Sequence, residues 1–369
     1  MTARPLAVLC VTAHSDRPET ETFIGLRDEG IDVHVMCSPS GRHYRRLLEA
    51  GVAVTPFEIA RKLEPRAIRR IRAEIERGGY DVLHLFNNKA VLHGVAAARG
   101  LPVKVVAYRG IVGNVSLLDP FAWLRYLSPR VDRIVCVAEA VRRHFLELRL
   151  LGLRVPPQKL VTIYKGHDLA WYRDPPVSLA ALGVPAAAFV IVCVANWRPR
   201  KGIEVLLDAF AALPDDPAMH LLLVGDMESP TLSRAIEWHP YRQRIHRIGV
   251  RGDAPAVAAA ANVAVLPSLK REGLPKTVIE AMAYGVPTIV TNVGGSPELV
   301  QHEVSGLVVP PGDARALGGA ILRLRGDPAF ARALGSRGRQ RIVQDFSIRT
   351  TIRRTAELYR ELVADRGRR

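Results

Sequence analysis

The sequence predicts an α/β protein with two doubly wound parallel sheets, each in its own domain. Short apolar runs rich in β-branched residues alternate with segments of helical spacing along the chain. A proline- and glycine-containing stretch at 168–185 interrupts this alternation, which then starts again. The length of 369 residues exceeds one ordinary core and suits two domains of roughly 150 to 200 residues each.

Five apolar runs are the predicted strands of the first half. They are Leu6–Val11, Asp32–Cys37, Val82–Phe86, Val103–Ala107 and Arg133–Val137. Helical spacing appears between them, for example over Asn88–Arg99 and Glu139–Leu148. Repeated strand–helix–strand units with apolar strands indicate a parallel sheet that helices cover on both faces.

A basic amphipathic helix is predicted over Glu64–Arg77. Its apolar positions recur at helical spacing and leave most of its arginines on the other side: Ala67, Ile68, Ile71 and Ile75 against Arg66, Arg69, Arg70, Arg72 and Arg77. Residues 1–165 carry 26 Lys+Arg against 16 Asp+Glu, which is +10 of the total +16. The helix is either a solvated face or a contact for anionic lipid headgroups or an anionic acceptor. No nucleic-acid-binding motif is present, so no specific nucleic acid is expected.

The second half repeats the pattern of the first. Its predicted strands are Phe189–Ala195, His220–Val224, Val263–Leu266, Thr288–Thr291 and Gly306–Val309. Ligands of such sheets bind beyond the carboxyl ends of the strands, and with two domains the natural site is the cleft between them.

Several common classes are excluded by missing motifs. The chain has no phosphate-binding loop of the G-x-x-x-x-G-K-[ST] type and no G-x-G-x-x-G after the first strand. The four cysteines lie far apart in apolar runs, without metal spacing. They are expected to be reduced core residues of a cytoplasmic protein.

Candidate site residues follow the strand Val263–Leu266. Glu272 lies in a loop shaped by glycine and proline, and the helix that starts at Lys276 carries Glu280. The unpaired N–H groups of a helix N-terminus favour phosphate. Glu280 stands among apolar residues, where a carboxylate is costly unless it is hydrogen-bonded, and a sugar diol is a suitable partner.

A second candidate cluster, Arg198, Arg200 and Lys201, follows the strand Phe189–Ala195 and precedes a predicted helix. Three cations at a strand-to-helix turn predict a cradle for pyrophosphate. A solvated charge run is the alternative if the cluster is taken alone.

Together these motifs resemble the large retaining GT-B glycosyltransferase family known as glycosyl transferases group 1, or family 4. The matching segments are 198–202, 220–226, 266–268, 272–276, 280–285, 294–298 and 306–313. The resemblance implies two Rossmann-like domains with an interdomain cleft, at 1–167 for the acceptor and 168–346 for a nucleotide-sugar donor. It also implies that a helix at 347–369 returns to the first domain. No metal cofactor is implied, and the chain has no Asp-x-Asp pair of the kind that holds metal in GT-A glycosyltransferases.

The resemblance also implies roles for single residues. Arg198 and Lys201 would hold the donor pyrophosphate, Glu272 would hold sugar hydroxyls, and these three are the candidate catalytic residues. Glu280 would bind the ribose. The remaining candidates for donor binding are Gly273, Leu274, Pro275, Lys276 and Asn196.

The first half departs from the family pattern at two loops. Thr12-Ala-His14-Ser15 stands where a Gly-Gly pair is common, and Tyr108-Arg109-Gly110 stands where a histidine is common. His14, Ser15 and Arg109 are therefore candidate substrate contacts, with a structural role as the alternative for Arg109.

The expected activity is transfer of a sugar to a glycan or lipid-linked acceptor with retention, in cell-envelope polysaccharide, lipopolysaccharide or glycolipid synthesis. The expected location is the cytoplasm, at the inner face of an anionic membrane. An epimerase of the same fold and a non-catalytic polyanion-binding protein are the alternatives.

Overall fold

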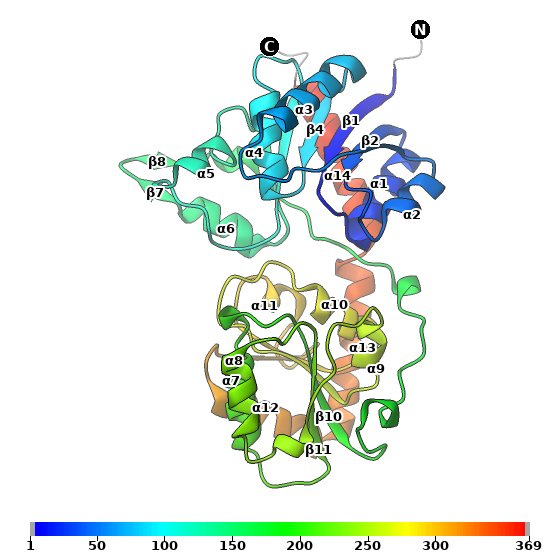
Figure 1. Ribbon diagram of the computed structural model, residues 1–369, viewed down its shortest axis with the longest axis vertical. Helices are drawn as coiled ribbons and strands as arrows, with labels where there is room; N and C mark the ends of the chain where they lie inside the picture. The colour runs from blue at the N-terminus through cyan, green and yellow to red at the C-terminus, as the bar shows by residue number, and fades with distance from the viewer. Residues whose placement is uncertain (1–3, 366–369) are drawn as a thin grey trace. The chain divides into compact units, whose positions relative to one another are not determined.

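The computed structural model describes residues 4–365, which divide into two compact units. The first unit contains the chain up to Gly166 together with Phe346 and the residues after it, and the second is His167–Asp345. The boundaries expected at 167/168 and 346/347 each lie one residue from these divisions. Each unit holds one large parallel sheet with helices on both faces, which confirms the predicted fold class (Figure 1).

Unit 1 contains a seven-stranded sheet in the order β3-β2-β1-β4-β5-β6-β9 within the described residues. Its strands are β1 (Leu6–Val11), β2 (Ile31–Cys37), β3 (Ala53–Pro56), β4 (Val82–Leu85), β5 (Lys104–Arg109), β6 (Arg133–Cys136) and β9 (Leu160–Thr162). All neighbouring strands pair in parallel. The order reverses direction between β1 and β4, so the loops that follow these two strands diverge and leave room for a ligand.

The helices of unit 1 include the last helix of the chain. They are α1 (Arg17–Asp28), α2 (Tyr44–Glu49), α3 (Pro65–Gly78), α4 (Asn88–Ala97), α5 (Pro120–Leu124), α6 (Glu139–Glu147) and α14 (Ile348–Ala364). Phe23 and Leu26 of α1 share one buried core with Leu358 and Leu362 of α14. Helix α14, red in Figure 1, therefore completes the first unit although it is the last element in sequence.

Helix α3 forms where the arginine-rich segment predicted it. Ala67, Ile71 and Ile75 are buried on its apolar stripe. A short antiparallel hairpin, β7 (Arg149–Leu150) and β8 (Leu153–Arg154), was not predicted.

Unit 2 contains a six-stranded sheet in the order β12-β11-β10-β13-β14-β15 within the described residues. Its strands are β10 (Phe189–Val194), β11 (Met219–Val224), β12 (Ile245–Arg247), β13 (Val263–Leu266), β14 (Thr288–Thr291) and β15 (Leu307–Val309). Its helices are α7 (Ile203–Ala211), α8 (Pro230–Glu237), α9 (Ala254–Ala259), α10 (Lys276–Ala283), α11 (Ser296–Leu299), α12 (Ala314–Gly326) and α13 (Pro328–Asp345).

Side chains alternate between two cores along β10. Ile191 and Cys193 belong to the core beneath α7 and α12, and Val190 and Val192 belong to the core beneath α9 and α10. This alternation explains why the central strand is apolar on both faces. All four cysteines are buried and unpaired. Among residues 4–365, no helix is both long and apolar enough to cross a membrane.

Candidate functional site

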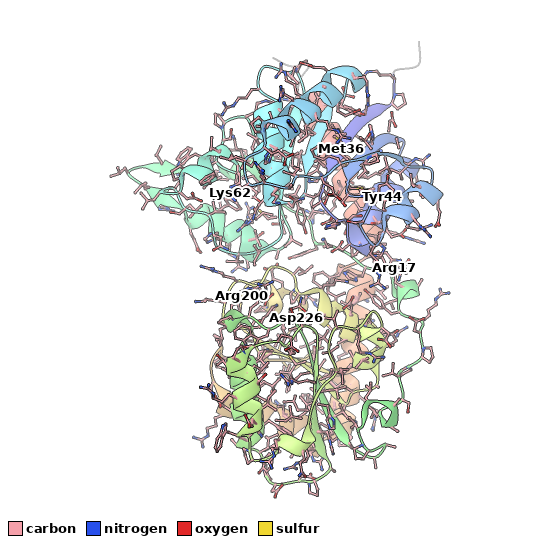
Figure 2. All side chains as sticks on the ribbon, in the orientation of Figure 1. Arg17, Met36, Tyr44, Lys62, Arg200 and Asp226 are labelled. Atoms are coloured by element: carbon pink, nitrogen blue, oxygen red, sulfur yellow. The ribbon has the colours of Figure 1, made fainter. Side chains whose placement is uncertain are left out.

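The candidate residues of unit 2 gather at one edge of its sheet. The loops after β10, β11, β13 and β14 all leave the carboxyl ends of parallel strands that are neighbours in the sheet. Arg200, after β10, and Asp226, after β11, lie at this same end (Figure 2). The order of the strands reverses between β10 and β13, which is where open α/β sheets bind their ligands.

An ion pair between Lys201 and Glu272 joins the two loops at this reversal. Lys201 Nζ lies 2.6 Å from Glu272 Oε1, and the side chains are only 16% and 7% exposed. Ser268 Oγ donates to the same oxygen at 2.6 Å, and an Arg200 nitrogen lies 3.5 Å from it. Glu272 Oε2 has no hydrogen-bond partner within residues 4–365. One carboxylate oxygen thus fixes the loop, and the other remains available.

The two loops also meet through backbone groups. Leu269 N–H donates to Arg200 O at 2.8 Å. Gly202 has φ +67°, and a Cβ there would lie 2.1 Å from Pro267 O. Only glycine both adopts this left-handed conformation without strain and leaves room for that carbonyl.

The loop after β14 supports Glu272 from the other side. Gly294 has φ +56°, and a Cβ there would lie 2.1 Å from Glu272 O. Gly295 N–H donates to Gly273 O at 2.9 Å. Arg271, directly before Glu272, has φ +62°, a conformation that costs a non-glycine residue roughly 1–2 kcal/mol. The chain thus accepts a strained residue immediately before a buried carboxylate.

The three cations of the loop after β10 differ in their exposure and in their contacts with Glu272. Arg198 is exposed, and its side chain has no partner within residues 4–365. Arg200, which was predicted as a member of the cation cluster without a role of its own, approaches Glu272 and donates to Arg271 O at 3.3 Å. Asn196 accepts from Asp226 N–H at 3.0 Å and so joins the loops after β10 and β11.

Glu280 is buried in α10 at 8% exposure, one helical turn after Lys276. Lys276 Nζ lies 3.2 Å from Glu280 Oε1. Pro275 is the N-cap of α10 and is buried, whereas Leu274 is half-buried. The first turn of this helix therefore combines a cation with unpaired N–H groups, a combination that favours an anion.

Of the three candidate substrate contacts in unit 1, Arg109 and Ser15 are buried and hydrogen-bonded within the protein, whereas His14 is exposed. Arg109 is buried and donates to Ile111 O at 3.0 Å and to Gly113 O. Both contacts order the loop after β5, which favours the structural role. Ser15 is buried and accepts from Thr20 Oγ1 at 2.8 Å.

His14 is exposed and lines a cavity of about 300 Å³, referred to below as the hydroxyl cavity. This cavity lies where β1, β2 and β4 end. Its polar lining residues are Thr12, His14, Ser38, Ser40, Glu58, Asn87 and Lys89. Ser38 and Glu58 were not predicted from the sequence, because neither belongs to a recognisable motif and only the loops of different strands bring them together.

Comparison with known proteins gives matches in both halves. The profile described as Glycosyl transferases group 1 matches residues 188–327, and that described as Glycosyltransferase Family 4 matches residues 21–171. The chain belongs to the group 1 glycosyltransferases of family 4. The first of these segments contains the Lys201–Glu272 pair, and the second contains the part of the hydroxyl cavity lining that runs from Ser38 to Lys89.

Relatives in this family align along nearly the full chain. The UDP-Gal:alpha-D-GlcNAc-diphosphoundecaprenol alpha-1,3-galactosyltransferase of Escherichia coli is 24% identical, over 95% of this chain and 94% of its own length. The lipopolysaccharide core biosynthesis glycosyltransferase LpsD of Rhizobium meliloti is 26% identical, over 92% and 93%. Both relatives are named as glycosyltransferases, and this chain aligns with more than nine-tenths of the length of each.

Solved structures share the fold. HepE of Anabaena, solved in complex with UDP, has a TM-score of 0.78 at 22% identity, with 96% of this chain and 99% of that chain covered. A glycosyltransferase of Rickettsia africae has a TM-score of 0.81 at 20% identity, with 98% and 99% covered. The GT-B architecture is therefore the fold of this family member.

Proposed function

We propose that this glycosyltransferase moves a hexosyl group from a nucleotide-sugar to an acceptor hydroxyl with retention of the anomeric configuration. The observation that carries the proposal is the 2.6 Å contact between Lys201 and Glu272. In a nucleotide-sugar the first sugar carbon is bonded directly to the diphosphate, so a cation for phosphate and a carboxylate for hydroxyls must be neighbours. The UDP-Gal in the name of the Escherichia coli relative and the UDP bound to HepE support this choice of donor class.

The cations stabilise the departing diphosphate. As the bond between the first sugar carbon and the diphosphate oxygen breaks, negative charge grows on the phosphate. Lys201 and Arg200 are held by their contacts with the Glu272 loop, and the exposed Arg198 of the loop after β10 adds a third cation. The acceptor oxygen forms its bond to the sugar carbon on the same face, and its proton passes to the departing phosphate oxygen. No metal enters this scheme, because side chains supply the positive charge.

The free oxygen of Glu272 accepts a hydrogen bond from a hydroxyl of the donor sugar. Glu280 accepts hydrogen bonds from the hydroxyls of the ribose. The hydroxyl cavity of unit 1 takes the acceptor, since its hydroxyl, amide and carboxylate groups resemble a sugar-binding lining. An epimerase of the same fold would release an altered nucleotide-sugar and no new glycoside. Analysis of the products by mass spectrometry separates the two activities.

Three substitutions test the donor site. The ligands are UDP, GDP and ADP, together with UDP-glucose, GDP-glucose and ADP-glucose. Glu280→Gln should weaken binding of both the free diphosphate and the nucleotide-sugar, because both contain the ribose. A charged hydrogen bond contributes roughly 1.5–3 kcal/mol, or about 10- to 150-fold in affinity. Glu272→Gln should retain diphosphate affinity and lose turnover, and Lys201→Ala should lose both.

Calorimetry and donor-hydrolysis rates measure these effects. Glu237→Gln is the matched control, because Glu237 is exposed at the end of α8 and makes no ion pair within residues 4–365. It should resemble the parent. If Glu272→Gln loses the diphosphate while Glu280→Gln keeps it, the two roles are reversed. If all three variants keep both affinity and rate, the proposed site is wrong.

A further inference from the structure

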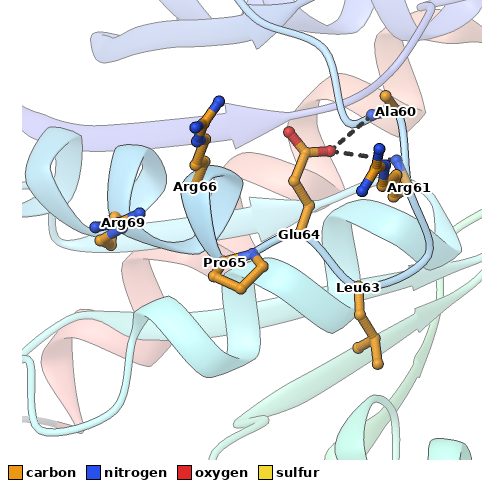
Figure 3. A pocket seen from close by; sticks show the side chains of 7 residues that line it. All are labelled: Ala60, Arg61, Leu63, Glu64, Pro65, Arg66 and Arg69. Atoms are coloured by element: carbon orange, nitrogen blue, oxygen red, sulfur yellow. Dashed lines mark hydrogen bonds between the residues drawn. The ribbon is translucent and has the colours of Figure 1, made fainter.

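A second cavity of unit 1 adjoins the hydroxyl cavity. It has a volume of about 580 Å³ and is lined by the turn before α3 and the first residues of that helix, including Arg61, Arg66 and Arg69 (Figure 3). Ala60 lines both cavities. This second cavity, called the arginine cavity below, therefore adjoins the place where the acceptor is proposed to bind.

The charge of the arginine cavity is not neutralised by the protein. The guanidinium groups of Arg61, Arg66 and Arg69 have no hydrogen bond or ion pair with any residue in 4–365. Arg70 and Arg72 of the same helix are engaged instead, since they donate to Pro56 O at 2.7 Å and to Arg99 O at 2.8 Å. Three guanidinium groups share this cavity with one carboxylate, that of Glu64, which leaves two positive charges.

Glu64 shows that the turn before α3 binds an anionic oxygen. Its Oε2 accepts from Ala60 N–H at 3.0 Å and from Arg61 N–H at 3.2 Å, drawn as dashed lines in Figure 3. Two successive backbone N–H groups directed at one oxygen are the arrangement with which protein chains hold phosphate. The carboxylate of the protein itself occupies this position.

Neighbouring side chains hold the turn in place. Lys89 Nζ donates to Ile59 O and to Ala60 O, at 2.8 Å each. Glu64 N–H donates to Nε2 of the buried His93 at 3.0 Å. The two N–H groups at 60 and 61 are thus fixed before any ligand arrives, which lowers the entropic cost of binding.

From these contacts we infer that the arginine cavity binds a phosphoryl group of the acceptor, which displaces the Glu64 carboxylate from the N–H groups of Ala60 and Arg61. The inference rests on the proposed function, because the sugar of that acceptor occupies the hydroxyl cavity. A phosphate monoester carries about −1.5 to −2 charges at neutral pH, which matches the two positive charges of the cavity. The acceptor is accordingly a sugar that carries a phosphate monoester.

An anionic membrane is the competing occupant, because it too would attract Arg66 and Arg69. A headgroup layer needs an open basic face and no oriented pair of N–H groups. The concave site and its position next to the hydroxyl cavity favour a phosphoryl group that belongs to a bound substrate.

Calorimetric titration with glucose 1-phosphate, and with glucose for comparison, tests the inference. Arg66→Gln combined with Arg69→Gln should weaken binding of glucose 1-phosphate by about ten-fold or more, since charge-assisted hydrogen bonds are lost. The affinity of this double variant for nucleoside diphosphate and its rate of donor hydrolysis should equal those of the parent. Arg332→Gln with Arg337→Gln removes two exposed arginines from α13 and is the charge-matched control, for which no change is expected.

Glu64→Gln gives an effect of the opposite sign. Removal of the competing negative charge should tighten binding of glucose 1-phosphate by about two- to five-fold, the range of an exposed charge pair. This variant also keeps the inference testable if the double arginine variant does not fold. Lys201→Ala should leave this binding unchanged, because the donor site is a separate one.

The inference is overturned if the parent binds glucose 1-phosphate no better than glucose, or if Lys201→Ala alone abolishes the binding. It is also overturned if Arg66→Gln with Arg69→Gln loses sedimentation with phosphatidylglycerol vesicles but keeps glucose 1-phosphate, because the arginines would then serve a membrane. If the parent does not bind nucleotide-sugar, the proposed function is refuted instead. The glucose 1-phosphate titration would still show whether the arginine cavity binds a phosphoryl group.

Discussion

Glu272 illustrates how single residues make this site. Its side chain is buried although Lys270 and Arg271, which precede it, are exposed. Burial of a carboxylate is costly unless ion pairs and hydrogen bonds compensate, and Lys201 with Ser268 provides both. The sequence predicted Glu272 and Lys201 from their motif. Ser268 and Arg200 lie in segments that belong to the sequence motifs, but their contacts with Glu272 were not predicted, because those contacts depend on how the loops after β10 and β13 meet.

Gly294→Ala should damage the site without touching an ionisable group. Because φ is +56° and the new Cβ would lie 2.1 Å from Glu272 O, the loop must move. We expect a loss of roughly 1–3 kcal/mol in the free energy of unfolding, measured in urea, and a lower rate of donor hydrolysis. Gly319→Ala on α12 is the control, since nothing lies within 4 Å of its added Cβ, and it should stabilise slightly. Equal stability and rate in both variants would contradict this account of Gly294.

At the scale of elements, apolar strands inside the sheets were easier to predict than most strands at the edges. The predicted ranges for β1, β13 and β14 agree with the structure. Strands β3, β9 and β12 have only three or four residues and were missed. All three lie at sheet edges, where pairing with a single neighbouring strand decides whether a strand forms.

Helix α14 provides a prediction at the same scale. Leu362 is 1% exposed in the core that α14 shares with α1 and the sheet of unit 1. Leu362→Ala should lower the stability of that unit by about 2–5 kcal/mol. Hydrogen exchange should therefore accelerate in peptides of β1 and β2 and stay unchanged in β10 and β11. The exposed neighbour Glu361→Ala should have little effect, and faster exchange confined to unit 2 would refute the assignment of α14 to unit 1.

At the scale of the whole molecule, each unit has one group of positive charges beside its proposed binding site. Unit 2 presents its cations beside Glu272, where we propose the diphosphate, and unit 1 presents three unpaired arginines beside the hydroxyl cavity. A net charge of +16 alone predicted only some anionic partner. The motifs placed the positive charge in the helix Glu64–Arg77 and in the cluster of Arg198, Arg200 and Lys201, and the structure adds which of these side chains already have partners.

The division into units predicts where the nucleotide stabilises the chain. A nucleoside diphosphate at one hundred times its dissociation constant should add roughly 2.7 kcal/mol to the unit that binds it. The protection should appear in the peptides that contain Lys201 and Glu272. Addition of UDP with hydrogen exchange as the readout measures this. If peptides around Ser38 and Glu58 are protected instead, the donor lies in unit 1 and the assignment is wrong.

The sequence alone determined the two α/β units and most of their central strands, because apolar runs and helical spacing are local properties. It also determined the family, since several motifs recur at fixed spacing in the second half. Tertiary structure decided that Arg200 rather than Arg198 approaches Glu272, and that Glu64 occupies the N–H groups of Ala60 and Arg61. Such contacts depend on the directions in which loops leave adjacent strands. Those directions are set by the pairing order of each sheet, which no short segment of sequence encodes.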